Sequence, residues 1–174
     1  EALTDVRNIE MTNSEVLVTA RSNSGDVYII FYEYGHSNPT SVAYFEPTPY
    51  DKIVDGNLAN EQGLYYLPDV LTDVRSVDIS GSEIILTSKA ESGDVVMTFY
   101  EPGTSNSTGF AHFQAINPDK LGTGNLTNEQ GLYYLPNGLT DIRDAKIENG
   151  EIVLTSRSDQ GEVFMVIYEF GQSE

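Results

Sequence analysis

A seven-residue segment that occurs twice without change carries the groups with which proteins bind sugars. It reads NEQGLYY, from Asn60 to Tyr66 and again from Asn128 to Tyr134. Tyrosine rings stack on sugar rings, and amide and carboxylate groups hydrogen-bond to hydroxyls. Two shallow sites on one chain would add avidity to a low individual affinity. The segment therefore predicts a glycan-binding site made of Asn60, Glu61, Gln62, Tyr65, Tyr66, Asn128, Glu129, Gln130, Tyr133 and Tyr134.

The same segment can instead be a joint between repeat units. In that interpretation the tyrosines are buried, and the Asn, Glu and Gln side chains hold loop backbone. If the paired tyrosines alternate along a strand, one of each pair faces the interior and the other faces outward. The segment occurs only between units, and this position favours the joint over the binding site.

A loop after residue 50 offers oxygen ligands for a cation. Asp51, Asp55 and Asn57 surround Gly56, and Ca²⁺ takes clustered oxygen ligands from loops with a sharp glycine turn. The spacing departs from that of an EF-hand, because Gln62 falls where the bidentate glutamate belongs. A solvated acidic loop is the alternative. Ca²⁺ is thus the one cofactor that the sequence suggests, and no other is expected.

Catalysis finds little support in the sequence. The two histidines, His36 and His112, fall at non-equivalent places without a recognisable nucleophile motif beside them. The chain has no cysteine, which removes thiol catalysis and thiolate metal sites. With 27 acidic residues, carboxylate pairs are too common to indicate a glycosidase. We therefore expect no catalytic residues and no enzyme.

The basic residues recur at matching places along the chain. In so acidic a protein, cations kept in register most simply neutralise neighbouring carboxylates. A row of guanidinium groups that recognises an acidic ligand is the alternative, and the surrounding negative field opposes it. The recurring cations are Arg7, Arg75 and Arg143; Arg21, Lys89 and Arg157; and Lys52 and Lys120; their expected partners are Asp5, Asp73 and Asp141 or Glu33, Glu101 and Glu169.

A repeat of 68 residues positions all of these groups. Leu3 aligns with Leu71 and Leu139 without gaps, because 71 − 3 and 139 − 71 are both 68. The chain therefore contains about 2.5 copies: unit 1 at 1–70, unit 2 at 71–138 and the half-unit 3 at 139–174. We expect these units to form one continuous β domain.

Turn residues divide the first half of each unit into three strands. Asn149-Gly150 and the equivalent Gly81-Ser82 are typical of two-residue hairpin loops. The third strand, at 27–32, 95–100 and 163–168, is apolar on both faces, which predicts packing from both sides. A fourth, short strand follows in the second half-unit, and then a segment that a proline ends.

The predicted fold class is all-β, a tandem repeat of antiparallel meanders with three to four strands each. Three strands plus a fourth per unit resemble a blade of a β-propeller. A complete propeller needs at least four blades, so one closed within this chain is not expected. A sandwich-like stack of meanders, or an oligomer that completes a propeller, remains as the alternative, and little helix is expected.

Charge and hydropathy restrict the partners. The formal net charge of −18 repels phosphate backbones and anionic lipids, so nucleic acid is not an expected partner. No apolar run approaches the roughly 20 residues that cross a bilayer, so membrane insertion is not expected. A start at Glu1 rather than Met, and two N-glycosylation sequons at 106–108 and 125–127, favour an extracellular or cell-surface location.

These observations lead to two hypotheses of function. An open repeat array leaves edges that must be capped or paired with another chain. The first hypothesis is therefore an exported structural or adhesive protein that self-associates, as a homo-oligomer or with neighbouring copies in a surface assembly or filament. The alternative is a carbohydrate-binding module, with a glycan as the partner of the NEQGLYY segments.

Overall fold

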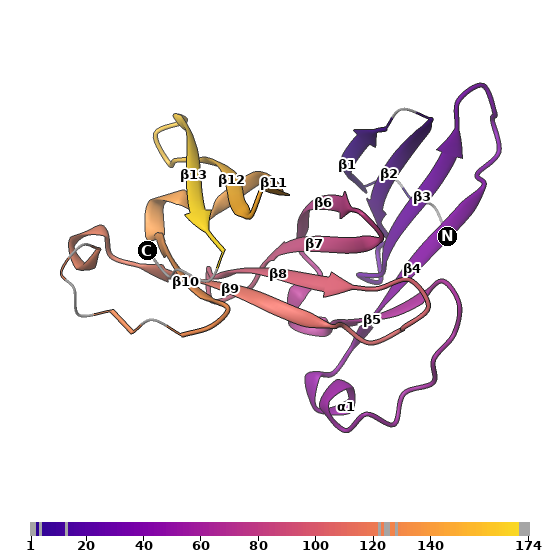
Figure 1. Ribbon diagram of the computed structural model, residues 1–174, viewed down its shortest axis with the longest axis horizontal. Coiled ribbons are helices and arrows are strands. Elements are labelled where there is room, and N and C mark those ends of the chain that lie inside the picture. The colour runs from indigo at the N-terminus through magenta and orange to yellow at the C-terminus, as the bar shows by residue number, and fades with distance from the viewer. Residues whose placement is uncertain are drawn as a thin grey trace.

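The computed structural model describes the chain except residues 1, 2, 4, 13, 122, 124, 125, 128 and 171–174. The described chain is almost entirely β-structure and forms three sheets (Figure 1). None of its helices is long and apolar enough to cross a membrane. Sheet A contains β1 (Asp5–Met11), β2 (Glu15–Arg21), β3 (Val27–Glu33), β4 (Ser41–Thr48) and β5 (Leu64–Pro68); sheet B contains β6 (Val74–Ser80), β7 (Glu83–Lys89), β8 (Val95–Tyr100), β9 (Gly109–Ile116) and β10 (Leu132–Pro136); sheet C contains β11 (Asp141–Glu148), β12 (Glu151–Arg157) and β13 (Val163–Glu169).

The predicted hairpins are present where turn chemistry requires them. Gly81 has a φ of 66° between β6 and β7, and Asn149 and Gly150 have φ values of 54° and 85° between β11 and β12. Left-handed backbone at these positions matches the twist of the flanking strands, which is why Gly and Asn occupy them. The all-β class and the antiparallel meanders that the sequence predicts are confirmed.

The second half-unit adds two strands rather than one. β4 pairs antiparallel with β3, and β5 then pairs parallel with β4, from Tyr44 opposite Leu64 to Thr48 opposite Pro68. A parallel partner needs a crossover, which here contains the short helix α1 (Tyr50–Val54). Unit 2 repeats the arrangement with β9 and β10, so the meander is extended to five strands. The described residues also include three short 3₁₀ helices: η1 (Asp69–Leu71), η2 (Pro118–Lys120) and η3 (Asn137–Leu139).

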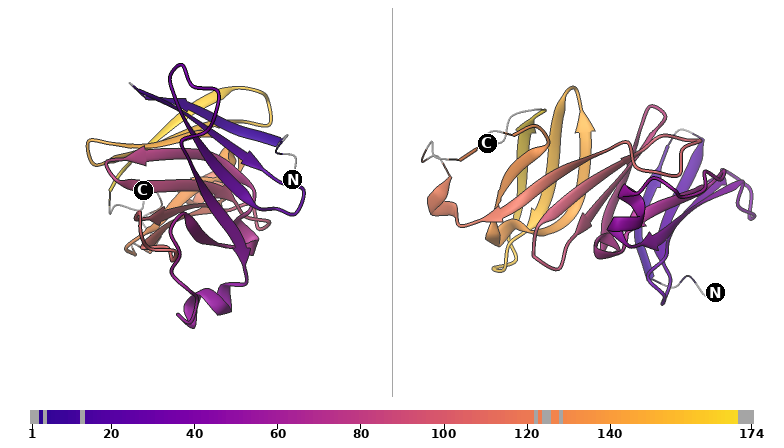
Figure 2. Two further views of the ribbon diagram at one scale, coloured as in Figure 1. Left: turned by 90° about the vertical axis from the view of Figure 1, so that its right-hand side faces the viewer. Right: turned by 90° about the horizontal axis from the view of Figure 1, so that it is seen from below.

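The three sheets stack face to face, with sheet B in the middle (Figures 1 and 2). Each sheet has a front face that points toward the next unit and a back face that points toward the preceding one. The front face of sheet A packs on the back face of sheet B in one buried cluster, the first junction. The front face of sheet B packs on the back face of sheet C in another, the second junction.

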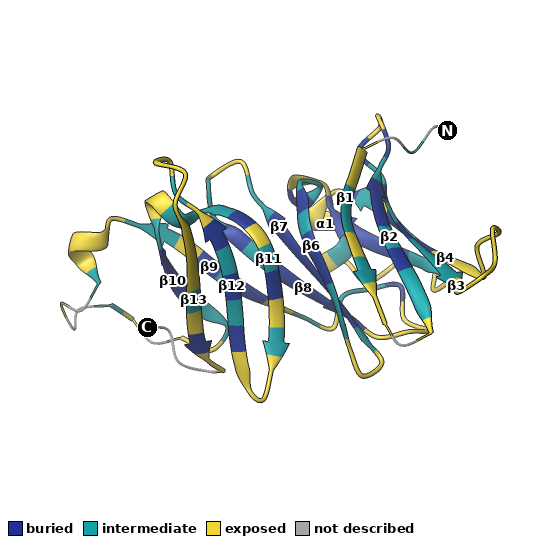
Figure 3. Cartoon of the chain, turned by 90° about the horizontal axis from the view of Figure 1, so that it is seen from above, coloured by how far each residue is buried: buried dark blue, intermediate teal, exposed yellow. Residues whose placement is uncertain are grey.

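This stacking decides where the apolar third strands are covered. β8 is covered on both faces, as the sequence predicts, because its residues contribute to both clusters. β13 is not: most of its residues are exposed, and Figure 3 shows this strand mainly in yellow. The expectation of two covered faces is therefore wrong for 163–168 and for 27–32, since no sheet of the described chain packs on the front of sheet C or on the back of sheet A.

Candidate functional site

The two junctions between sheets are the part of the molecule with the most specific chemistry. At the first junction, Tyr100 of sheet B contacts Phe45 and Tyr65 of sheet A edge-on, with ring centroids 5.2 and 5.5 Å away. Its hydroxyl donates to the backbone oxygen of Tyr66 at 3.0 Å. Burial raises the pKa of Tyr100, so the phenol stays protonated and remains a donor. The ring thus anchors one sheet on the next.

The second junction repeats this anchor 68 residues later. Tyr168 contacts Phe113 and Tyr133 edge-on, at 5.3 and 5.5 Å. Its hydroxyl donates to the backbone oxygen of Tyr134 at 2.9 Å, and burial raises its pKa as well. Edge-to-face aromatic pairs add about 0.5–1.5 kcal/mol beyond their buried area. The same anchor therefore joins both pairs of sheets.

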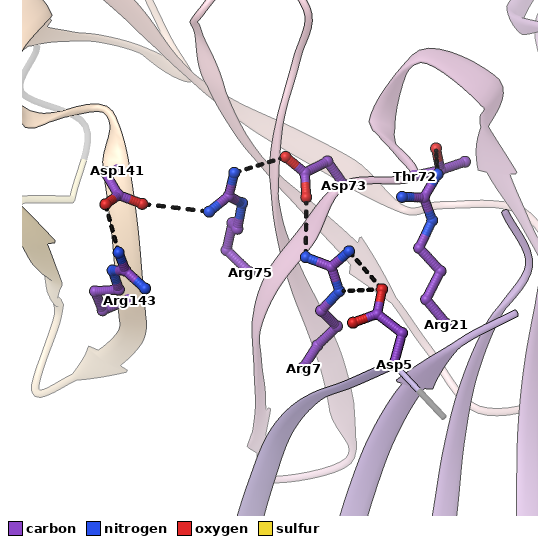
Figure 4. A network of polar contacts seen from close by, with 8 residues as sticks. All are labelled: Asp5, Arg7, Arg21, Thr72, Asp73, Arg75, Asp141 and Arg143. Carbon is purple, nitrogen blue, oxygen red and sulfur yellow. Dashed lines mark hydrogen bonds and ion pairs between the residues drawn. The ribbon is translucent and has the colours of Figure 1, made fainter. Parts of the chain in front are cut away.

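A ladder of alternating charges runs along the stacked first strands of the three units (Figure 4). Arg7 donates to Asp5 of its own unit at 2.6 Å and reaches Asp73 of the next unit at 3.3 Å. Arg75 repeats this with Asp73 at 2.8 Å and Asp141 at 3.3 Å. The predicted pairing of recurring cations with aspartates is confirmed for Arg7 and Arg75, and each of these arginines bridges two units. It is wrong for the second set of recurring cations, where Arg21 donates to the hydroxyl of Thr72 at 3.1 Å instead.

The ladder ends at Arg143. This residue holds Asp141 of its own unit at 2.6 Å. Its side chain is 52% exposed, compared with 24% for Arg7 and for Arg75. Within the described residues, no carboxylate lies on the far side of Arg143 in the way that Asp73 and Asp141 lie beyond the other two.

Side chains also bond to the backbone of the neighbouring unit along these strands. Asn8 donates to the backbone oxygen of Val77 at 3.0 Å. Its equivalent Ser76 accepts from the backbone amide of Ala145 at 3.1 Å and donates to Asp144 at the same distance. These bonds link the first strands of successive units directly.

The NEQGLYY connector of unit 1 contacts the loop between β8 and β9 of unit 2. The Asn60 side chain donates to the backbone oxygen of Gly103 at 2.7 Å and accepts from the amide of Ser105. The hydroxyl of Ser105 in turn accepts from the amide of Glu61 and donates to its carbonyl. The side-chain amide of Asn60 therefore helps to join the two units, as the joint interpretation predicts.

The two tyrosines of each connector alternate in direction along their strand, as expected, but all four are buried, so the ring that points away from the junction is not exposed. Tyr65 packs in the first junction, stacked on Phe45 at 4.8 Å. Tyr66 points the other way, but its own loop covers it and the backbone oxygen of Ala59 accepts from its hydroxyl. Tyr133 and Tyr134 are buried in the same two ways. All four residues are thus at most 7% exposed, and Tyr65 and Tyr133 each line one of the two pockets beside the connectors.

The remaining connector residues leave a more open surface. Glu61 and Gln62 are exposed, and together with Asn60 they line a pocket of about 870 Å³ that extends to the turn between β6 and β7. In unit 2, Gln130 lines a pocket of about 460 Å³, Glu129 is exposed, and Asn128 lies outside the described residues. Glycan binding at the connectors stays a prediction.

The loop proposed for calcium is an exposed helical turn. Asp51 lies in α1, and Asp55 follows it with its amide donating to the Asp51 carbonyl at 3.0 Å. Asn57 comes after Gly56, whose φ is 66°. Within the described residues, no three His, Cys, Asp or Glu side chains gather as a metal site. Calcium binding by Asp51, Asp55 and Asn57 stays a prediction.

The histidines lie apart. His36 is exposed beside Glu33, at 3.6 Å from its carboxylate. His112 on β9 contacts Asp94 at 3.1 Å. Burial raises the pKa of Asp94, but bonds from the Ala115 amide and from His112 outweigh it and leave the pKa lowered. In unit 1 the hydroxyl of Tyr44 takes the place of the imidazole on Asp26. The equivalent carboxylates Asp26 and Asp94 therefore hold the fourth strand of each unit, β4 through Tyr44 and β9 through His112.

At one end of the stack, the back face of sheet A lies open. Val6 and Ile9 are 49% and 60% exposed, whereas their equivalents in sheet B, Val74 and Val77, are 0% and 3% exposed. Both pairs share the same register, with Ile9 opposite Val18 and Val77 opposite Leu86. The face that sheet B buries against sheet A is thus uncovered in sheet A itself.

At the other end, the front face of sheet C lies open. Val163 and Met165 are 71% and 67% exposed, and their equivalents Val95 and Met97 are each 0% exposed. Ile167, one pleat further along β13, is also exposed. The two open faces are therefore the complementary halves of the junction that occurs twice inside the chain.

Comparisons with known proteins assign no family to this chain. No protein-family model matches the chain, and no curated protein matches it. Among solved structures, an uncharacterized protein from Listeria monocytogenes aligns over 100% of this chain and 42% of its own length, with 11% sequence identity and a TM-score of 0.36. The chain thus spans less than half the length of that protein.

The residues that define the junctions were only partly visible in the sequence. The charged positions were found, because their register is constant. The anchoring tyrosines were not recognised, since a third strand that is apolar on both faces conceals which positions matter. The signal was available: Tyr32, Tyr100 and Tyr168 occupy one repeat position without change.

Proposed function

We propose that this chain is a structural repeat protein that self-associates through the open faces of its terminal sheets, as part of a surface assembly or filament outside the cell. One observation carries the proposal. The apolar positions that the first three strands of a unit bury at both internal junctions recur on the two faces that no sheet of the described chain covers. Apolar patches this continuous on a soluble protein commonly mark association sites.

The charge of the chain supports association at specific places on the surface rather than over the whole surface. A net charge of −18 keeps copies apart over most of their surface. Attraction is then restricted to places where apolar side chains are concentrated, and the two open faces are such places. An acidic protein whose apolar side chains are concentrated on two faces suits an ordered assembly better than nonspecific adhesion.

The experiment measures molecular mass by light scattering from low to high micromolar concentration, in native salt with and without calcium. We expect the mass to rise with concentration. Met165→Lys places a charge on the open front face of sheet C and should hold the mass near that of one chain. Val54→Lys introduces the same charge at an equally exposed valine of α1, away from both open faces, and should behave as the unchanged protein.

The folded state is checked by circular dichroism, because both substitutions are at exposed side chains and should leave it intact. A chain that stays strictly monomeric at every concentration, with and without calcium, would remove the proposal. Association that both lysine variants retain would place the contact elsewhere and would also overturn it.

A further inference from the structure

The charge ladder indicates how two copies would be oriented on one another. At each internal junction an arginine of one unit reaches the aspartate of the next through Nη1, at 3.3 Å in both cases. Asp73 and Asp141, which accept these bonds, have side chains 36% and 35% exposed. Asp5, at the start of the ladder, is 51% exposed and holds only Arg7 through its Oδ2 among the described residues.

The two ends of the ladder are therefore complementary. Arg143 has the donor that Arg7 and Arg75 each extend to the following unit, and Asp5 has the acceptor that Asp73 and Asp141 each present to the preceding unit. Asp5 is on β1 with the exposed Val6 and Ile9, and Arg143 is on β11, at the edge of sheet C opposite to the exposed apolar residues of β13.

We propose that a second copy of the chain docks head to tail, with the back face of its sheet A on the front face of sheet C of the first copy and with its Asp5 accepting from Arg143. This inference rests on the proposed function and names the partner and register of that contact. Its basis is continuity: the same pair of faces and the same ion pair occur at both junctions inside the chain.

A contact between two like faces is disfavoured by the same charges. Two sheet C faces would bring Arg143 near Arg143, and two sheet A faces would bring Asp5 near Asp5. A front-to-back contact is heterologous, and heterologous contacts produce open chains of copies or closed rings rather than isolated dimers. The predicted product is thus a series of oligomers that lengthens with concentration.

The contact between copies should be weaker than an internal junction. Among the described residues, sheet C has three strands and no equivalents of β4 and β5, which supply Phe45 and Tyr65 to the first junction. The Tyr32 of an incoming copy would find no such aromatic partners. Association that reverses on dilution follows from this smaller contact.

The test exchanges the two charges. Arg143→Glu and Asp5→Arg each place like charges opposite one another between copies, and each should weaken self-association about 3- to 10-fold at low salt. The double variant restores opposite charges with reversed sign and should return to within about 2-fold of the unchanged protein, because the two sites couple across the contact. Lys120→Glu, an equally large charge change on an exposed residue away from both faces, serves as control.

Sedimentation velocity over a concentration series measures each association, and circular dichroism confirms the fold of each variant. Recovery in the double variant supports the head-to-tail contact. Two results would overturn the head-to-tail contact but not self-association. In the first, the single variants associate as well as the unchanged protein. In the second, the double variant associates as weakly as the single variants. An unchanged protein that never associates removes the proposed function itself.

Discussion

The two internal junctions use the same anchors but different bonds along their first strands. In both, a tyrosine hydroxyl donates to a backbone oxygen of the preceding unit and an arginine bridges two aspartates. Along the strands, Asn8 makes one bond to unit 2, whereas Ser76 is fully enclosed and bonds to both Ala145 and Asp144 of unit 3.

A second difference involves charge. Position 10 and its equivalents 78 and 146 are Glu, Asp and Lys, since 78 − 10 and 146 − 78 are both 68. Asp78 accepts from the backbone amide of Ile147 across the second junction at 3.3 Å. One carboxylate oxygen of Glu10 is buried with no partner among the described groups. The tyrosine and arginine anchors are thus common to both junctions, whereas the polar positions differ, and we expect that difference to make the two junctions unequal in strength.

The anchors should contribute equally to the two junctions. Tyr100→Ala and Tyr168→Ala each delete a buried ring and should each lower the free energy of unfolding by about 3–5 kcal/mol. Tyr32→Ala, at the equivalent place on the open face of sheet A, should cost about 1 kcal/mol or less because no sheet packs on it. Urea unfolding followed by circular dichroism measures all three. Unequal losses for Tyr100 and Tyr168 would break the equivalence of the junctions.

The polar bonds along the first strands should contribute different amounts of stability at the two junctions. Ser76→Ala leaves the Ala145 amide without its acceptor in a buried place, which should cost about 1–3 kcal/mol. Asn8→Ala removes one bond at a partly exposed place and should cost about 0.5–1.5 kcal/mol. The same urea measurement compares them, and Ser80→Ala, at the exposed end of β6, provides a control that should change little. A larger loss for Asn8 than for Ser76 would reverse the proposed order of strength.

Much of this fold was predictable because the same turn residues and charged residues recur at equivalent positions of the repeat. The hairpins at Gly81 and Asn149 follow from turn residues, and the ion pairs of Arg7 and Arg75 follow from cations kept in register with aspartates. Local chemistry determines these features, so a sequence pattern is enough to predict them.

Other features depend on contacts that a pattern does not contain. The parallel pairing of β5 with β4 joins segments separated by α1, and nothing in the residues 64–67 specifies the direction of their partner. Burial of Tyr66 depends on its own loop, through the Ala59 carbonyl. The open face of β13 depends on which sheets are present, since its residues are as apolar as those of the enclosed β8.

The smallest expected effect comes from the carboxylate of Glu10 at the first junction. Burial, with Asp78 as a nearby negative charge, raises the pKa of Glu10; the ammonium of Lys146 opposes this and the carboxylate of Asp144 adds to it. The folded pKa therefore lies above the unfolded value, so ionised Glu10 destabilises the folded state. That cost is present at neutral pH and is relieved as the pH falls through the folded pKa.

Glu10→Gln removes this cost without removing the side chain. The variant should melt about 1–2 °C above the unchanged protein at pH 7, where a chain of this size gains roughly 2–4 °C per kcal/mol. The gap should close as the pH is lowered, because Glu10 itself becomes neutral. Glu148→Gln, on an exposed carboxylate at the end of β11, should leave the midpoint unchanged at either pH. A gap that persists or widens in acid would mean that Glu10 acts through something other than its charge, and the difference between the junctions would then lie in the Asn8 and Ser76 bonds alone.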